Sequence, residues 1–143
     1  MELEFRTTED DINWNELSDL YRRAPLGTKS ANELEKAFSN SMFKCFVWSS
    51  GNIIGAGRAL ADGVDCSYIC DIAILPEHQG KGIGGDIISY LLKASEGHKK
   101  IILYSVPGRE SFYEKHGFKR MSTAMAIFQD QTKALNIGLV NET

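Results

Sequence analysis

The chain has 143 residues, 43% of them hydrophobic, and a formal net charge of −3. This length suits one domain with a single buried core, and the longest apolar runs are far shorter than the roughly 20 residues of a membrane-spanning helix. The acidic balance argues against nucleic acid as a partner, because proteins that bind nucleic acids gather Lys and Arg on one face to neutralise phosphates.

The N-terminal part of the chain predicts a strand and two helices. Residues 1–6 alternate charged and apolar side chains, which indicates a short strand at 3–5. They lack the basic and then apolar layout of a secretory signal, so we expect a cytoplasmic protein without membrane attachment. Apolar residues recur at helical spacing over 13–23. Ser30, with Glu33 three residues later, has the pattern of a capping box and predicts the start of a second helix.

Residues 44–75 predict three strands. The segments 44–49 and 53–60 are strand-like, and residues 50–52 (SGN) between them supply the positive φ angles of a tight reversal, so we expect a hairpin. Residues 67–75 form the next strand. Its second half is apolar at every position, as in a strand that is covered on both faces, and we therefore place it at the centre of the sheet.

A helix and a further strand follow. Residues 87–94 carry apolar side chains along one helical face, and Gly97 ends that helix. Residues 101–105 return as a strand. Together with the strand at 67–75 they form a βαβ unit, whose two strands are expected to be parallel.

The C-terminal part predicts a short helix at 111–116 and two more strands at 118–120 and 123–128. Residues 130–143 are polar with scattered apolar side chains, which leaves an extra strand or a dimer contact open. The predicted fold class is therefore α/β, with one domain over residues 1–143 and a mixed sheet of six or seven strands.

A glycine-rich segment over residues 79–85 connects the strand at 67–75 to the helix at 87–94. This junction offers free backbone N–H groups and the positive end of a helix dipole, which both favour an anion. Lys81 adds a positive charge, and glycine lets a ligand oxygen approach the main chain closely. Four glycines within residues 80–85 would weaken a helix start by about 1 kcal/mol each. We therefore favour a phosphate-bearing ligand over a turn without one.

Two other phosphate-binding motifs fit this segment less well. Gly80, Gly82 and Gly85 satisfy the G-x-G-x-x-G pattern of dinucleotide sites. That site needs an acid at the end of the next strand to hold the ribose, and residues 101–105 contain none. The P-loop requires Gly-Lys followed by Ser or Thr, which is absent here.

Residues 79–84 (QGKGIG) resemble the acetyl-CoA signature of the GNAT acetyltransferases, which is Gln or Arg, two residues, Gly, one residue, then Gly or Ala. Residues 74–76 (ILP) and 112–118 (FYEKHGF) look like the flanking pieces of that family, in the same order. The resemblance covers about residues 53–128. It implies a largely antiparallel central sheet with a parallel βαβ core and helices on both faces.

The resemblance also implies that main-chain groups hold acetyl-CoA. The N–H groups of residues 80–85 would hold the pyrophosphate, and residues 72–74 would pair with the pantetheine arm like a strand. Many relatives place an Asn before the helix that carries Tyr113, whereas residues 106–110 (VPGRE) contain none. The cofactor-binding residues predicted in this way are Ile72, Ala73, Ile74, Gln79, Gly80, Lys81, Gly82, Ile83, Gly84, Gly85 and Tyr113.

Acetyl transfer needs a neutral amine, a donor to the oxygen that gains charge and stabilisation of the departing thiolate. A lysine-like amine is mostly protonated at neutral pH, so its deprotonation costs roughly 4–5 kcal/mol. Asp71, the acid within the apolar strand, is the predicted base, directly or through a water; a hydrogen-bonded structural Asp is the alternative. The resemblance implies Tyr113 as the acid for the sulfur, with a packed aromatic as the alternative, and the Ile74 N–H as the oxyanion donor.

We therefore expect an enzyme that moves an acetyl group from acetyl-CoA directly to a primary amine in a ternary complex. A small-molecule amine is favoured over a protein or peptide amine. A non-catalytic acyl-CoA-binding module is the alternative, and a homodimer is left open. Asp62, Asp65 and Glu33 would either attract a cationic amine or lie on the solvated surface.

The cysteines and histidines do not form a site of their own in the sequence. Cys45, Cys66 and Cys70 lie outside the glycine-rich segment, and we expect buried core thiols rather than acetyl acceptors. No CxxC motif is present and the three histidines are scattered, so reduced thiols and no metal site are expected.

Overall fold

The structure is a computed structural model that describes residues 2–142. Its chain forms two compact units, of which the first ends at Leu103 and the second begins at Tyr104. The first unit carries every predicted site residue except Tyr113. No helix within the described residues is both long and apolar enough to cross a membrane.

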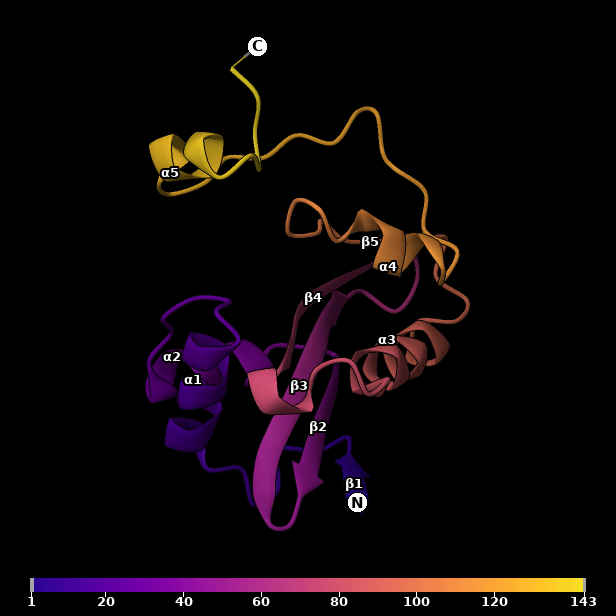
Figure 1. Cartoon of the computed structure of the whole chain (residues 1–143). Coiled ribbons are helices and arrows are strands. Elements are labelled where there is room, and N and C mark those ends of the chain that lie inside the picture. The colour runs from indigo at the N-terminus through magenta and orange to yellow at the C-terminus, as the bar shows by residue number, and fades with distance from the viewer. Residues whose placement is uncertain (1, 143) are drawn as a thin grey trace. The chain divides into compact units, whose positions relative to one another are not determined.

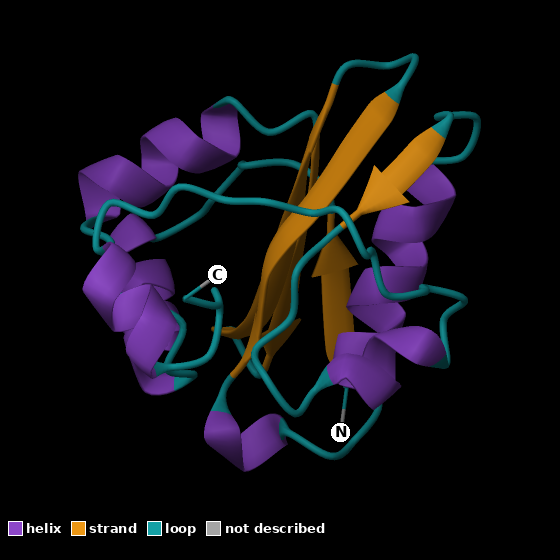
Figure 2. Ribbon diagram, turned by 90° about the horizontal axis from the view of Figure 1, so that it is seen from above, coloured by secondary structure: helices purple, strands orange, loops and turns teal. Residues whose placement is uncertain are grey.

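The first unit is built on a five-stranded sheet, whose strands lie side by side in chain order. The strands are β1 (Leu3–Arg6), β2 (Phe43–Ser49), β3 (Asn52–Ala61), β4 (Cys66–Ile74) and β5 (Lys100–Ile102). Neighbouring strands are antiparallel except β4 and β5, which are parallel, so the predicted βαβ unit is confirmed. Seen from above, the sheet has a pronounced twist (Figure 2).

Helices cover both faces of this sheet, as the sequence predicts. The helices α1 (Trp14–Arg23) and α2 (Ala31–Ser39) lie on one face, and α3 (Ile83–Ala94) lies on the other (Figure 1). The core under α1 and α2 is aromatic: the rings of Phe38 and Phe46 are 5.1 Å apart between centroids. The core under α3 is aliphatic and includes Ile87, Ile88 and Leu91, all fully buried.

Local sequence signals set the ends of these elements. The side chain of Asn13 accepts hydrogen bonds from the N–H groups of Asn15 and Glu16 and begins α1. Ser30 and Glu33 form the predicted capping box at α2. Ser50 and Gly51 have φ angles of 51° and 81°, so a two-residue turn closes the predicted hairpin between β2 and β3.

Two glycines of β3 allow α3 to approach the sheet closely. A Cβ atom at Gly57 would lie 2.7 Å from Ile87 Cγ2, and one at Gly55 would lie 2.9 Å from Ile74 Cδ1. Side chains at these positions would therefore push α3 and the end of β4 away. The close packing fixes the distance between the middle of α3 and the sheet.

The second unit contains the helices α4 (Glu110–Glu114) and α5 (Gln131–Asn136). The short helix predicted at 111–116 is therefore confirmed with slightly different ends. The strands predicted at 118–120 and 123–128 are wrong, because these residues form irregular backbone with a bend at residue 123. Phe118 and Phe128 instead pack edge-on against Tyr113 and Tyr104. Alternating apolar residues suit a strand but do not supply the partner that a strand must pair with.

The predicted number of strands is also wrong, and one of the two alternatives left open for the tail does not occur. The described residues contain five strands rather than six or seven. The extra strand considered for 130–143 is instead the helix α5, which Asp130 caps by accepting a hydrogen bond from the Lys133 N–H at 2.9 Å. Residue 143 lies outside the described residues.

Candidate functional site

The glycine-rich segment connects the end of β4 to the start of α3. A short 3₁₀ turn, η1 (Pro76–His78), follows β4 and leads into Gln79. The Gln79 side chain donates a hydrogen bond from Nε2 to the Ile74 carbonyl at 3.0 Å, which ties the segment back to the strand. Gly80 and Gly82 have φ angles of 78° and 83°, in the left-handed region that favours glycine.

The N-terminus of α3 is open for a ligand. Gly82 occupies the N-cap position, and no side chain caps the helix there. The first N–H groups of a helix have no partner within the helix, so those at the start of α3 remain available as donors. A Cβ atom built at Gly80 or Gly82 would meet nothing within 4 Å. The backbone therefore presents donors at the positive end of a helix dipole, which suits a phosphate group.

The last residues of β4 form a second open feature of the main chain. The pairing of β4 with β5 ends at Tyr68 and Ile102, whereas β4 continues to Ile74. On the other side, the Leu75 N–H donates to the Ile54 carbonyl of β3 at 2.8 Å. Because antiparallel partners alternate between bonded and non-bonded pairs, the Ile74 N–H points away from β3. An extended ligand could pair with this edge of β4.

Asp71 lies where β4 departs from regular pairing. Ala56 pairs with Ala73 and Arg58 pairs with Cys70, so a β-bulge lies between them. Asp71 has a φ angle of 57°, which costs an ordinary residue about 1–2 kcal/mol. This conformation therefore needs support from its surroundings.

Three side chains from other elements contact Asp71, and a fourth, Ser41, contacts one of them. Its carboxylate Oδ2 accepts a hydrogen bond from Arg58 Nε at 2.8 Å, and Lys29 Nζ lies 3.9 Å away. Its main-chain carbonyl accepts a hydrogen bond from the Tyr21 hydroxyl at 2.6 Å. Arg58 also donates from Nη1 to Ser41 Oγ at 3.3 Å. The predicted base therefore belongs to a mostly buried polar network.

Tyr113, the predicted acid, lies on α4 in the second unit. Its ring packs edge-on against Phe112 and Phe118. Burial raises the pKa of Tyr113, and the positive charge of Arg109 opposes this effect. The phenol is therefore protonated at neutral pH and can donate a hydrogen bond. Its role beside the cofactor stays a prediction.

The other acids that the sequence raised, Asp62, Asp65 and Glu33, have partners within the protein. The Asp62 carboxylate accepts N–H bonds within its own turn, at 2.8 Å from Val64 and 2.7 Å from Asp65. Asp65 pairs with Lys100 at 2.7 Å, and Glu33 belongs to the capping box. Each of these carboxylates thus has a partner within the protein, and an attraction of the three for a cationic amine stays a prediction.

Of the three thiols expected in the core, Cys45 is buried, whereas Cys66 and Cys70 are half-buried. Burial disfavours Cys45 and Cys70 as nucleophiles. It raises the pKa of Cys45 and of Cys70 to about 11. Both thiols are therefore protonated at neutral pH, whereas the thiolate is the reactive form.

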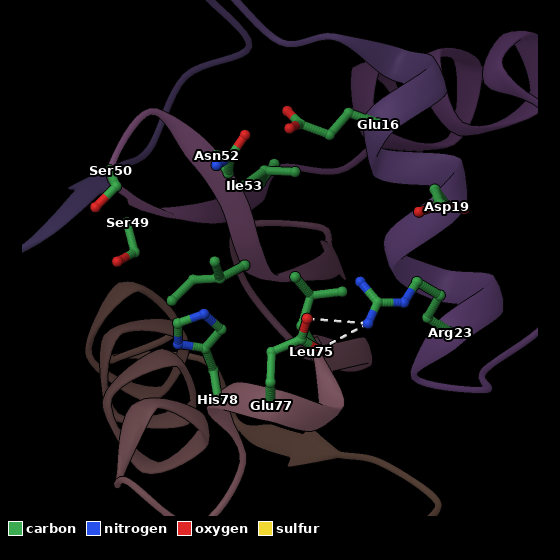
Figure 3. A pocket seen from close by; sticks show the side chains of 11 residues that line it. Glu16, Asp19, Arg23, Ser49, Ser50, Asn52, Ile53, Leu75, Glu77 and His78 are labelled. Carbon is green, nitrogen blue, oxygen red and sulfur yellow. Dashed lines mark hydrogen bonds and ion pairs between the residues drawn. The ribbon is translucent and has the colours of Figure 1, made fainter.

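A cavity of about 500 Å³ lies beside the glycine-rich segment, between α1, the β2–β3 turn and η1 (Figure 3). None of the predicted site residues lines it. Across the cavity, Arg23 Nη2 donates hydrogen bonds to Glu77 Oε1 at 2.8 Å and to Glu77 Oε2 at 2.9 Å. The Glu77 backbone N–H and the Arg23 guanidinium hold the pKa of Glu77 below its usual value. Sequence reasoning missed this cavity because its walls come from three distant segments, and no local pattern marks it.

Comparisons with known proteins show which proteins this chain is similar to. A family model described as "Acetyltransferase (GNAT) domain" matches residues 41–120. An N-acetyltransferase of Prochlorococcus marinus, named ycf52-like, is 32% identical over 109 residues, which cover 72% of this chain and 61% of the relative. The chain thus spans less than two thirds of that relative's length.

Two further similarities extend the match along the chain. Serotonin N-acetyltransferase 2 of Oryza sativa, a chloroplastic protein, is 25% identical, with 92% of this chain and 70% of the relative covered. The solved structure of a GNAT-family acetyltransferase from Streptococcus pneumoniae superposes with a TM-score of 0.75 at 21% identity, covering 90% of this chain and 99% of that one. The latter similarity concerns the fold.

Proposed function

The chain belongs to the GNAT acetyltransferase family, and we propose that it moves an acetyl group from acetyl-CoA directly to a primary amine. The observation that carries this proposal is the uncapped N-terminus of α3 behind Gly80 and Gly82. It lies next to the open edge of β4, so one extended ligand with a diphosphate can use both features.

Each part of acetyl-CoA is assigned to main-chain groups of β4 or of the glycine-rich segment. The N–H groups of residues 80–85, with Lys81 at the surface, would hold the diphosphate. Ile72, Ala73 and Ile74 would pair with the pantetheine arm, and the Ile74 N–H would donate to the thioester oxygen as it gains negative charge. Gln79 holds the segment against β4 through the Ile74 carbonyl.

The chemistry moves one acetyl group and one proton. The amine nitrogen bonds to the carbonyl carbon, the carbon–sulfur bond breaks, and the amine gives up a proton. The Tyr113 phenol would donate a hydrogen bond, or its proton, to the departing sulfur. Two roles are open for Asp71: it takes the amine proton, directly or through a water, or it holds β4 in shape.

The acceptor is proposed to be a small-molecule amine. The match to a serotonin N-acetyltransferase over most of this chain supports that class, although the relative is only 25% identical. A protein or peptide amine is the second branch of the same reaction. A homodimer and a cytoplasmic location stay predictions.

The test combines calorimetry with a panel of amines. We expect the protein to bind CoA and acetyl-CoA, and to release free CoA thiol only when an accepted amine is present. Binding of CoA without turnover on any small amine, peptide N-terminus or lysine would instead indicate a non-catalytic module. Absence of CoA binding at millimolar concentration, or competition by NAD, would reject the proposal.

A further inference from the structure

At the β-bulge, the main-chain carbonyl of Asp71 accepts its hydrogen bond from helix α1 rather than from a neighbouring strand. Gly57 of β3 lies opposite both Asp71 and Ile72, so β4 has one residue more than β3 at this point. The Asp71 carbonyl accepts the Tyr21 hydroxyl of α1 instead of a strand partner. Tyr21 is only 3% exposed, and burial raises the pKa of its phenol well above the usual value, so it stays a donor.

The side chain of Asp71 is held from the neighbouring strand. Arg58 reaches it from β3, and the exposed fractions of the two side chains are 12% and 17%. Lys29 approaches from the α1–α2 connection, where the Ser18 hydroxyl donates to the Lys29 carbonyl at 2.7 Å. Main chain and side chain of Asp71 are thus both fixed by residues outside β4.

The bulge decides which N–H groups face the open edge of β4. Successive residues of a strand point their N–H groups to opposite sides. After the bulge, Leu75 bonds to Ile54 of β3, and Ile74 points to the other side. If β4 lost the extra residue by a slip of one position, Ala73 would take the place of Ile74 and the edge would present the wrong donors.

We propose that Arg58 and Tyr21 are positioning residues that hold Asp71 in its left-handed conformation, and that Asp71 maintains this bulge rather than taking the amine proton. The catalytic consequence rests on the proposed function, because it concerns the donor offered to the thioester. The structural consequence, which is the pairing of β4 after the bulge, does not depend on that function.

The first arm of the test measures hydrogen exchange of the Leu75 amide. Tyr21→Phe and Arg58→Lys should each speed this exchange about tenfold, because each removes a hydrogen bond that supports the bulge. Lys44→Met is the matched control. Lys44 lies opposite Arg58 on β2, has a side chain 15% exposed and pairs with Glu9 rather than Asp71. It should leave the Leu75 amide unchanged.

The second arm measures kinetics with an amine that the wild-type protein accepts. Tyr21→Phe and Arg58→Lys should lower kcat about threefold to tenfold at a nearly unchanged CoA affinity. Asp71→Asn keeps an oxygen that can accept from Arg58 Nε. It should lower kcat to a similar degree and leave the pH dependence of kcat/KM in place.

Two results would overturn the inference. Unchanged Leu75 exchange in both Tyr21→Phe and Arg58→Lys would show that neither residue supports the bulge. A shift of the pH profile to higher pH in Asp71→Asn would assign Asp71 as the base. Without wild-type turnover the proposed function fails separately, and the exchange arm still decides whether the two residues hold the bulge.

Discussion

The start of α3 and the surroundings of Asp71 differ in whether their polar groups have hydrogen-bond partners within the protein. At α3 no side chain caps the first N–H groups, and two glycines leave the space in front of them open. Around Asp71 the carbonyl and the carboxylate are both bonded to Tyr21 and Arg58. A region that leaves donors unsatisfied is suited to bind, whereas a region that satisfies its polar groups internally is suited to hold the shape of the sheet.

The strongest test of the open region places a side chain at Gly82. Gly82→Val forces a branched residue into a φ angle of 83° and puts methyl groups in front of the helix N-terminus. We expect the affinity for CoA, measured by calorimetry, to fall about 100-fold or more, because the donors that hold the diphosphate are displaced.

Gly97→Val is the matched control for this change. Gly97 has a φ angle of 95°, also meets nothing within 4 Å of an added Cβ, and lies beyond the other end of α3. Both variants should lose similar stability, but only Gly82→Val should lose affinity. Equal affinity in the two variants would contradict the assignment of the diphosphate to this helix end.

Changes around Asp71, where the polar groups are hydrogen-bonded within the protein, should alter the stability of the fold. Arg58→Met leaves the Asp71 carboxylate partly buried without its main partner, so we expect the free energy of unfolding to fall by about 2–3 kcal/mol, after allowing for partial exposure. Urea unfolding measures it. Adding Asp71→Asn should recover part of the loss, and no recovery in the double variant would argue against a direct interaction.

Tyr113→Phe separates binding from chemistry. Removal of the hydroxyl should lower kcat about tenfold, because a donor to the departing sulfur is lost, and should lower CoA affinity much less than kcat. Stopped-flow detection of thiol release measures the rate, with Tyr90→Phe on α3 as the control. An unaltered kcat would remove Tyr113 from the reaction.

The last prediction concerns two thiols whose pKa is raised by burial, Cys45 in β2 and Cys70 in β4. The pKa of Cys45 and Cys70 is raised from 9.0 to about 11 in the folded protein. Above pH 9 the unfolded chain loses these protons while the folded protein keeps them, so the unfolding free energy should fall as the pH rises from about 9 to 11. Urea unfolding across this range should show a shallower fall in the Cys45→Ala/Cys70→Ala variant, and an equal slope would contradict burial as the cause.

Local sequence patterns were sufficient for much of the first unit. The capping box at Ser30 and Glu33, the reversal at Ser50 and Gly51, and the βαβ unit around the glycine-rich segment all depend on residues close together in the chain. The open start of α3 was predictable for the same reason, since a glycine-rich start of a helix after a buried strand is a continuous stretch of sequence, and its role in binding stays a prediction.

The features that could not be predicted from the sequence depend on residues that lie far apart in the chain. The partners of Asp71 come from α1 and β3, and Tyr21 is 50 positions away in the chain. The strands expected at 118–120 and 123–128 had a suitable pattern, but the pattern does not determine whether a pairing partner is present. The cavity beside η1 likewise joins three separate segments.

A structure of the protein soaked with CoA is the most direct test of the central claim. We expect the diphosphate oxygens within hydrogen-bonding distance of the N–H groups that begin at Gly82 and Ile83, with the pantetheine arm extended along Ile72–Ile74 of β4. Density for the diphosphate at any other place on the protein would contradict the account, whatever the fold resembles.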